Sequence, residues 1–126
     1  MARTLEFQTD ALIVRLTGLT RFAALRGVLR IPYTKIQSVS AEPFHMPAGS
    51  IRVGGTSLPF TDYRQGNFWK RGIGWFFLSY EHADKTVTLQ VDNLASGRFD
   101  FSMVVLGADD PAAVAAEIDT HRRSSR

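Results

Sequence analysis

The sequence has no cysteine in its 126 residues. Disulfide bonds, thiolate nucleophiles, cysteine-ligated zinc and iron–sulfur clusters are therefore excluded. A long apolar run is missing too, because the richest stretch, residues 73–78, is far shorter than the roughly 20 residues that span a bilayer. The first ten residues include Glu6 and Asp10 and lack the apolar segment of a secretory signal. We therefore expect a cytoplasmic protein.

Recognisable catalytic motifs are also absent. None of the three histidines, His45, His82 and His121, lies near a nucleophile elbow of the G-x-S-x-G type. The glycine pair at 54–55 is not followed by the Lys-Ser/Thr of a phosphate-binding loop. Residues 81–84, Glu-His-Ala-Asp, could converge on a divalent metal, but such clusters are more often exposed hairpin turns. We expect no enzymatic activity, no catalytic residue, no metal and no cofactor.

The net charge of +3 is small but unevenly distributed. Residues 1–75 hold ten Lys and Arg against four Asp and Glu, or +6, whereas residues 76–126 hold five against eight, or −3. This division indicates either one basic surface or cations spread over solvated faces. Because the net charge is low and the aromatic strand pattern of RNA-binding domains is missing, we expect no nucleic-acid partner.

Short alternating segments with turn residues between them recur about every 8–12 residues, as in antiparallel sandwiches and barrels. In the last of them, alternation predicts that Phe99, Phe101, Met103 and Val105 all face inward. No helix separates the segments to make parallel crossovers. The strands are expected at residues 11–17, 27–32, 35–43, 67–70, 73–80, 86–91 and 98–105, with short extended pieces at 50–53 and 56–60.

The end of the chain has the pattern of a single helix. Asp110 is suited to the N-cap and Pro111 to the first helical position. Ile118 belongs to a narrow apolar stripe, and residues 121–123 place His and Arg in the last turn, where cations complement the helix dipole. A helix this short needs a surface to dock on. We predict a helix over Asp110–Arg122 that covers the open end of the β structure.

Three segments resemble parts of small bacterial pleckstrin-homology (PH)-like domains. LRGVLRIPYTKIQSV is similar to their second-to-third strand passage, where one strand ends at proline and an isoleucine begins the next. IRVGGTSLP followed by GNFW resembles their central glycine positions, and DDPAAVAAEI resembles their final helix. The resemblance implies a mostly β fold, an antiparallel seven-stranded barrel or sandwich capped by one C-terminal helix. The length of the chain predicts one domain, 1–126, and the resemblance places its core at about 11–122 with a frayed tail at 123–126.

The segment GNFWKRGIGWFF, residues 66–77, holds both tryptophans of the chain. Alternation assigns Trp75 and Phe77 to the core, where aromatic side chains bury large areas. Residues 68–72, Phe-Trp-Lys-Arg-Gly, instead have the composition of an exposed turn. Two interpretations of Trp69 stay open: an exposed tip that suits an interface, or a side chain that folds back onto the barrel.

These observations favour a non-enzymatic module that recognises a protein partner or itself, and the resemblance implies that homo-oligomers form in this family. The alternative is a peripheral binder of anionic lipid or another anionic ligand through a basic and aromatic surface. A small enzyme or ligand carrier that uses the barrel mouth is a third hypothesis. The candidate binding residues are Arg21, Arg26, Arg64, Phe68, Trp69, Lys70 and Arg71.

Overall fold

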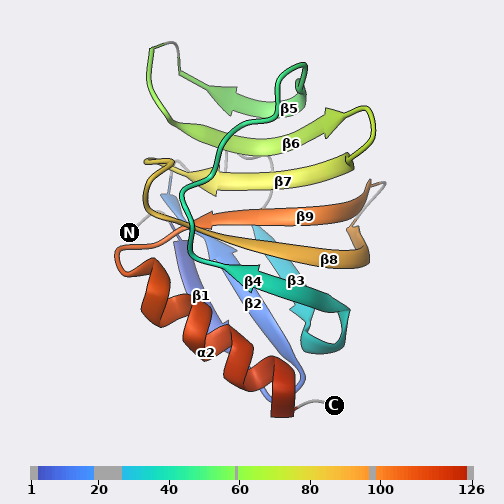
Figure 1. Ribbon diagram of the computed structural model, residues 1–126, viewed down its shortest axis with the longest axis vertical. Helices are drawn as coiled ribbons and strands as arrows, with labels where there is room; N and C mark the ends of the chain where they lie inside the picture. Colours follow the sequence, from blue (N-terminus) through green and yellow to red (C-terminus); the bar gives the residue numbers. More distant parts are fainter. Residues whose placement is uncertain (1–2, 19–26, 59, 97–98, 125–126) are drawn as a thin grey trace.

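The computed structural model describes residues 3–18, 27–58, 60–96 and 99–124, which form two β-sheets and a C-terminal helix (Figure 1). The elements are β1 (Arg3–Phe7), β2 (Ala11–Leu16), β3 (Val28–Pro32), the 3-10 helix η1 (Tyr33–Lys35), β4 (Ile36–Ser40), β5 (Ile51–Ser57), β6 (Arg64–Lys70), β7 (Gly74–Tyr80), β8 (Thr86–Ser96), β9 (Phe99–Gly107) and α2 (Pro111–Ser124). The expectation of a mostly β chain with one C-terminal helix is confirmed.

The small sheet has the order β1-β2-β3, and the large sheet has the order β4-β8-β9-β7-β6-β5. Strand pairs are antiparallel with one exception, since β7 and β9 run parallel. The last strand of the chain therefore inserts between β7 and β8, which are neighbours in sequence. The prediction of a purely antiparallel arrangement was wrong at this pair, because strand pairing is decided by partners distant in sequence.

The two sheets face each other across the main hydrophobic core. The alternating residues of β2 and β8 point into it, as the sequence pattern predicted. Phe77 and Phe101 fill its centre with no exposed surface, and Trp75 packs against its edge with its ring 4.9 Å from that of Phe99. Trp75 is half-buried, so Phe77 contributes more to the core than Trp75 does.

A second apolar cluster covers the opposite face of the large sheet. Consecutive strands β4 and β5 lie at opposite edges of this sheet, so the segment 41–50 must cross its outer face, as Figure 1 shows. Phe44 of this segment packs there, and its backbone N–H donates to the Ala83 carbonyl at 2.9 Å. The large sheet is thus buried on both faces, which explains why residues 76–80 form an uninterrupted buried run.

The inward face of β9 changes partway along the strand. Phe101 lies in the main core, but Met103 and Val105 lie in the second cluster, where they had been expected to face the main core. The register of β9 shifts against β7 in this region, and the hydroxyl of Ser102 donates to the Ile73 and Trp75 carbonyls. Since a register shift of one residue reverses every later side chain, simple alternation failed beyond Phe101.

Helix α2 has the predicted start and packs beside both sheets. The carboxylate of Asp110 accepts from the Ala113 N–H at 3.2 Å, the expected N-cap contact. Ile118 is fully buried in the main core, and the His121 ring stacks between Phe7 and Tyr33, with 5.1 Å to each. No helix in the described part of the chain has the length and apolar content needed to cross a membrane.

Several expected boundaries need correction. The two sheets do not close into a barrel, and the described residues contain nine strands where seven were expected. Strand β1 belongs to the small sheet, although the core was expected to begin at residue 11. The pieces expected at 50–53 and 56–60 are largely one strand, β5, and β8 continues through residues expected to turn. Arg123, assigned to a frayed tail, is the penultimate residue of α2.

Candidate functional site

The predicted binding residues do not form one cluster. Arg21 and Arg26 lie outside the described residues. Arg64 begins β6 and donates to the Thr61 and Tyr63 carbonyls, both within its own turn. The other four predicted residues, Phe68, Trp69, Lys70 and Arg71, lie at the far end of β6 and in the turn to β7.

The turn between β6 and β7 is exposed at its tip, as expected. Arg71 and Gly72 are exposed, and the Ile73 N–H donates to the Lys70 carbonyl at 3.0 Å. Phe68, however, is only 3% exposed and packs on Phe76 in the second cluster. Its burial removes it from the residues that could contact a partner. Trp69 is half-buried opposite Trp75, between the two alternatives that the sequence left open.

The glycines at 55 and 66 have a structural explanation. Gly55 and Gly66 face each other across β5 and β6 with φ of 135° and 125°. A Cβ on Gly55 would lie 2.0 Å from the Gln65 carbonyl oxygen, and a Cβ on Gly66 would lie 2.2 Å from the Gly54 carbonyl oxygen. Only glycine allows this close crossing and this backbone conformation. Gly55 and Gly66, in the glycine-rich middle of the chain, are therefore required by the fold.

The outer strand β5 exposes apolar side chains at the edge of the large sheet. It pairs with β6 on one side, and among the described residues no strand pairs with its other side. Five large hydrophobic side chains are exposed in the described chain, and four of them lie on β5 or just after it. They are Ile51, Val53, Leu58 and Phe60.

Phe60 is the most exposed of these side chains, with a relative exposure of 107%. It has a φ of 62°, a conformation that residues other than glycine adopt infrequently. The turn around it is held by Thr61, whose N–H and hydroxyl both donate to the Leu58 carbonyl and whose hydroxyl also accepts from the Tyr63 N–H. The aromatic ring is therefore presented to solvent by a hydrogen-bonded turn.

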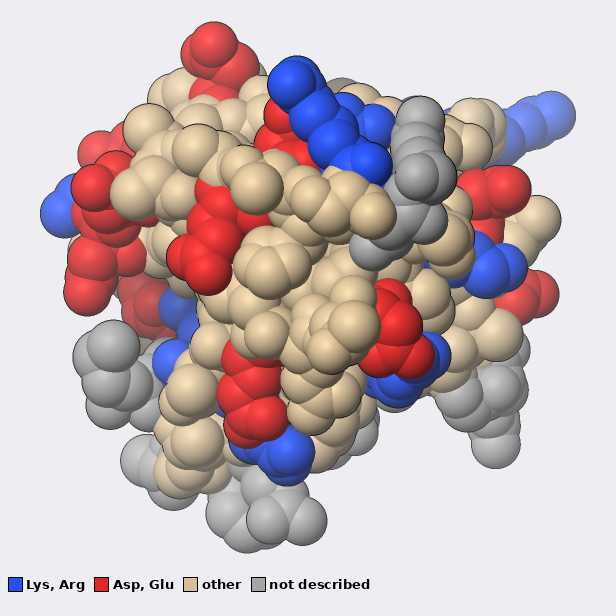
Figure 2. Space-filling view, turned by 90° about the horizontal axis from the view of Figure 1, so that it is seen from below, with Lys and Arg blue, Asp and Glu red and all other residues tan. Residues whose placement is uncertain are grey.

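The region around β5 also carries four cations that form no ion pair within the described part of the chain. In the small sheet, Arg15 pairs with Glu6 and Arg30 pairs with Asp10. Figure 2 shows that acidic and basic side chains are mixed over the end of the molecule opposite β5. Residues 51–80 hold four cations and one Asp, which makes +3 and equals the net charge of the whole chain. The four cations are Arg52, Arg64, Lys70 and Arg71. None of them forms an ion pair with a carboxylate among the described residues.

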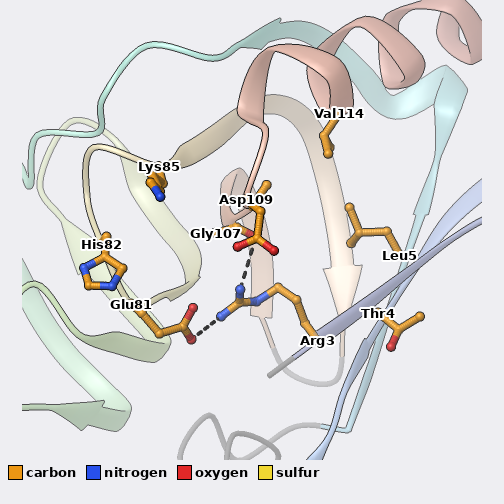
Figure 3. A pocket seen from close by; sticks show the side chains of 10 residues that line it. Arg3, Thr4, Leu5, Glu81, His82, Lys85, Gly107, Asp109 and Val114 are labelled. Atoms are coloured by element: carbon orange, nitrogen blue, oxygen red, sulfur yellow. Dashed lines mark hydrogen bonds and ion pairs between the residues drawn. The ribbon is translucent and has the colours of Figure 1, made fainter. Parts of the chain in front are cut away.

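A pocket of about 320 Å³ lies at the other end of β7, between β1, the β7–β8 turn and the start of α2 (Figure 3). Arg3 forms one wall. Its side chain is only 9% exposed and donates to the Ser79 hydroxyl at 3.1 Å, the Gly107 carbonyl at 3.1 Å and the Glu81 carboxylate at 2.5 Å. The polar residues that line the pocket are Arg3, Thr4, Glu81, His82, Lys85 and Asp109, and the other lining residues are Leu5, Gly107, Ala108 and Val114.

Buried polar groups support this wall from behind. The Gln65 amide donates to the Glu81 carboxylate at 3.2 Å, and its carbonyl accepts from the Ser79 hydroxyl at 2.6 Å. Gln65 and Ser79 have no exposed surface, so the network holds Arg3 and Glu81 in place. Burial also raises the pKa of the neighbouring Tyr80 to about 12, since the charged phenolate is disfavoured away from water.

The pocket was not apparent from the sequence. Its charged residues come from the chain start, from the 81–85 turn and from the residue before the α2 cap. Glu81 and His82 were noted only as part of a local cluster, and no local signal links Arg3 to position 81. The pairing of Thr86 in β8 with Gly107 in β9 brings Lys85 close to Asp109, and the hydrogen bonds of Arg3 to Gly107 and Glu81 join β1 to them across the two sheets.

Comparison of the chain with protein-family models, curated proteins and solved structures found no match in any of the three. Its function must therefore be inferred from β5, the β6–β7 turn and the pocket.

Proposed function

We propose that this protein is a non-catalytic interaction module that binds an extended, acidic segment of a partner protein along β5. The observation that carries the proposal is the group of exposed apolar side chains at the outer edge of the large sheet, from Ile51 to Phe60. A strand edge with unpaired backbone groups can add one more strand from a partner, and flanking side chains supply specificity.

The composition of β5 suits strand addition. Proteins usually protect an edge with proline, inward charges or bulges. β5 has a register irregularity between Arg52 and Gly54, but the following stretch, residues 54–57, contains neither proline nor a charged residue. This stretch therefore lacks the proline and the charges that usually protect a strand edge. Val53 and Leu58 lie at the two ends of this stretch and are 45% and 47% exposed. Both can contact side chains of a partner strand added at this edge.

The charge of this region selects the partner. Residues 51–80 carry +3, so two copies of the chain that paired through β5 would bring two like-charged surfaces together. An acidic segment would meet attraction in place of repulsion, and its association would weaken with added salt. Charge therefore favours an acidic partner over self-association. Membrane lipids share the negative charge, but they have no backbone groups to pair with a strand edge.

The arrangement implied by the PH-like resemblance, a β body with one C-terminal helix, supports this placement of the binding site. A C-terminal helix docked on a two-sheet body leaves the far strands free to bind, and β5 lies far from α2 (Figure 1). The candidate residues Lys70 and Arg71 contribute to the positive charge near one end of β5, where Ile51 pairs with Trp69. Phe68 is buried against Phe76, so it stabilises β6 and does not contact the partner.

Selection from a random octapeptide display library tests the proposal, with affinities of the selected peptides measured by fluorescence polarisation. We expect peptides that alternate apolar residues with Asp or Glu. Val53→Ser and Phe60→Ser should each weaken their binding tenfold or more, as should Arg52→Glu. Val28→Ser is the matched control, because Val28 is 47% exposed on β3 and should leave the affinity unchanged.

Amide hydrogen exchange adds a direct readout of strand pairing, since bound peptide should protect amides within residues 54–57. Three outcomes would overturn the proposal. Selected peptides could lack acidic residues, or the protein could form a dimer that Val53→Ser disrupts. Alternatively, no peptide could bind while phosphatidylserine vesicles sediment the protein in a way that depends on Phe60, which would identify a lipid surface.

A further inference from the structure

The pocket at the start of α2 lies apart from β5 and plays no part in the proposed partner binding. It is bounded by β1, the β7–β8 turn and the segment that leads into α2 (Figure 3). Its volume of about 320 Å³ is at the lower end of the range for small-molecule sites, which begins at roughly 300 Å³. A pocket of this volume suits a molecule of about single-residue size.

One wall of the pocket is rigid and electrically balanced. Arg3 and Glu81 neutralise each other, and Arg3 has two further hydrogen bonds that hold its guanidinium in place. Gly107 leaves room for this group, since a Cβ there would lie 2.9 Å from Nη1 of Arg3. A preorganised wall of this kind lowers the ordering cost when a ligand binds.

Two further charges in the pocket are not used by the fold. Lys85 and Asp109 both line it and both are exposed. Neither forms an ion pair within the described part of the chain. The pocket thus offers one positive and one negative group of its own, beside a wall whose charges cancel.

The remaining surface is apolar. Leu5 of β1 and Val114 of α2 lie along one side of the pocket, as Figure 3 shows, and Ala108 lies between Gly107 and Asp109. Leu5 and Val114 also pack against the main core, which fixes their positions. An apolar group of a ligand could be removed from water there, at a gain of roughly 25 cal/mol per Å².

We propose that this pocket binds a free α-amino acid with an apolar side chain. The ligand carboxylate would accept from the Lys85 ammonium, and its own ammonium would donate to the Asp109 carboxylate. Both contacts are charge-assisted hydrogen bonds. The apolar side chain would lie against Leu5 and Val114. A ligand with only one of the two charges would leave either Lys85 or Asp109 without a partner.

Isothermal titration calorimetry with L-leucine tests this assignment, with 3-methylbutylamine and 4-methylpentanoate as matched compounds that lack the carboxylate or the ammonium. L-leucine should bind at millimolar or lower concentration, and each matched compound should bind at least tenfold more weakly. Lys85→Met and Asp109→Asn should each weaken L-leucine binding at least tenfold. Lys35→Met and Asp92→Asn change charged residues outside the pocket lining and should have no effect.

Lys85 and Asp109 are exposed, so their variants should fold, which unchanged circular dichroism and melting temperature would verify. Failure of L-leucine, L-methionine and L-phenylalanine to bind at millimolar concentration would overturn the proposal. So would equal affinity for L-leucine and 4-methylpentanoate, because the ammonium would then make no contact. Loss of peptide binding at β5 would not affect either result, since the two sites share no residue.

Discussion

The guanidinium of Arg3 lies 2.5 Å from a carboxylate oxygen of Glu81, a residue 78 positions later in the chain. This ion pair joins the first strand of the small sheet to the end of β7 in the large one. Truncation by Arg3→Met should therefore loosen both the sheet-to-sheet contact and the pocket wall, because it leaves the Glu81, Ser79 and Gly107 oxygens without this donor.

We expect Arg3→Met to lower the free energy of unfolding by about 1–3 kcal/mol, a range that allows for the partial exposure of Glu81. Urea denaturation followed by circular dichroism measures this change. Arg15→Met is the matched control, because Arg15 pairs with Glu6 at the surface and its loss should have little effect. Equal effects of the two variants would show that the Arg3 network does not stabilise the fold.

The second apolar cluster should depend on the crossing segment 41–50. Phe44 is 8% exposed and lies edge-on to Tyr80, with ring centroids 5.9 Å apart. Phe44→Ala should cost about 3 kcal/mol of stability, because it leaves a cavity on the outer face of the large sheet. Phe60→Ala changes the same residue type at an exposed position and should stay within about 0.5 kcal/mol. Chemical denaturation of both variants compares them, and an unaffected Phe44→Ala would contradict the docking of this segment.

The crossing of β5 over β6 should tolerate no side chain at Gly66. In Gly66→Ala the new Cβ would collide with the Gly54 carbonyl, and alanine would also be strained at a φ of 125°. We expect a loss of at least about 3 kcal/mol. Gly72→Ala isolates the backbone term, since its φ is 89° but no atom lies within 4 Å, and should cost about 1 kcal/mol. Similar melting temperatures for the two variants would argue against the close crossing.

Tyr80 should make the protein sensitive to alkali. Burial raises its pKa from 10 to about 12, so the folded state favours the neutral phenol. The stabilisation is complete below pH 10, where the unfolded chain also holds the proton, and it is lost as the pH rises from 10 towards 12. Urea denaturation at pH 8 and pH 11 should show this loss in the native protein and in Tyr63→Phe. Tyr80→Phe should reduce the loss, and an unchanged pH dependence would refute the assignment.

The sequence alone determined the features that depend on residues close together in the chain. The α2 start was predicted because Asp110 and Pro111 carry capping and first-turn preferences that act within one turn. The β2 and β8 segments were predicted because alternation reports directly on one buried face. The turn after β6, exposed at Arg71 and Gly72, was likewise recognisable from Lys70, Arg71 and the following glycine.

Only the tertiary structure decided which strands pair and which faces are buried. Phe68 could be buried because the segment 41–50 covers an outer face that local alternation assigns to solvent. Met103 changed faces because the β9 register shifts beside its parallel partner β7. Lys85 and Asp109 lie at the same pocket because Thr86 of β8 pairs with Gly107 of β9, and Arg3 reaches that pocket from the other sheet. Such arrangements depend on contacts between residues tens of positions apart, and their energies have no counterpart in any short window of sequence.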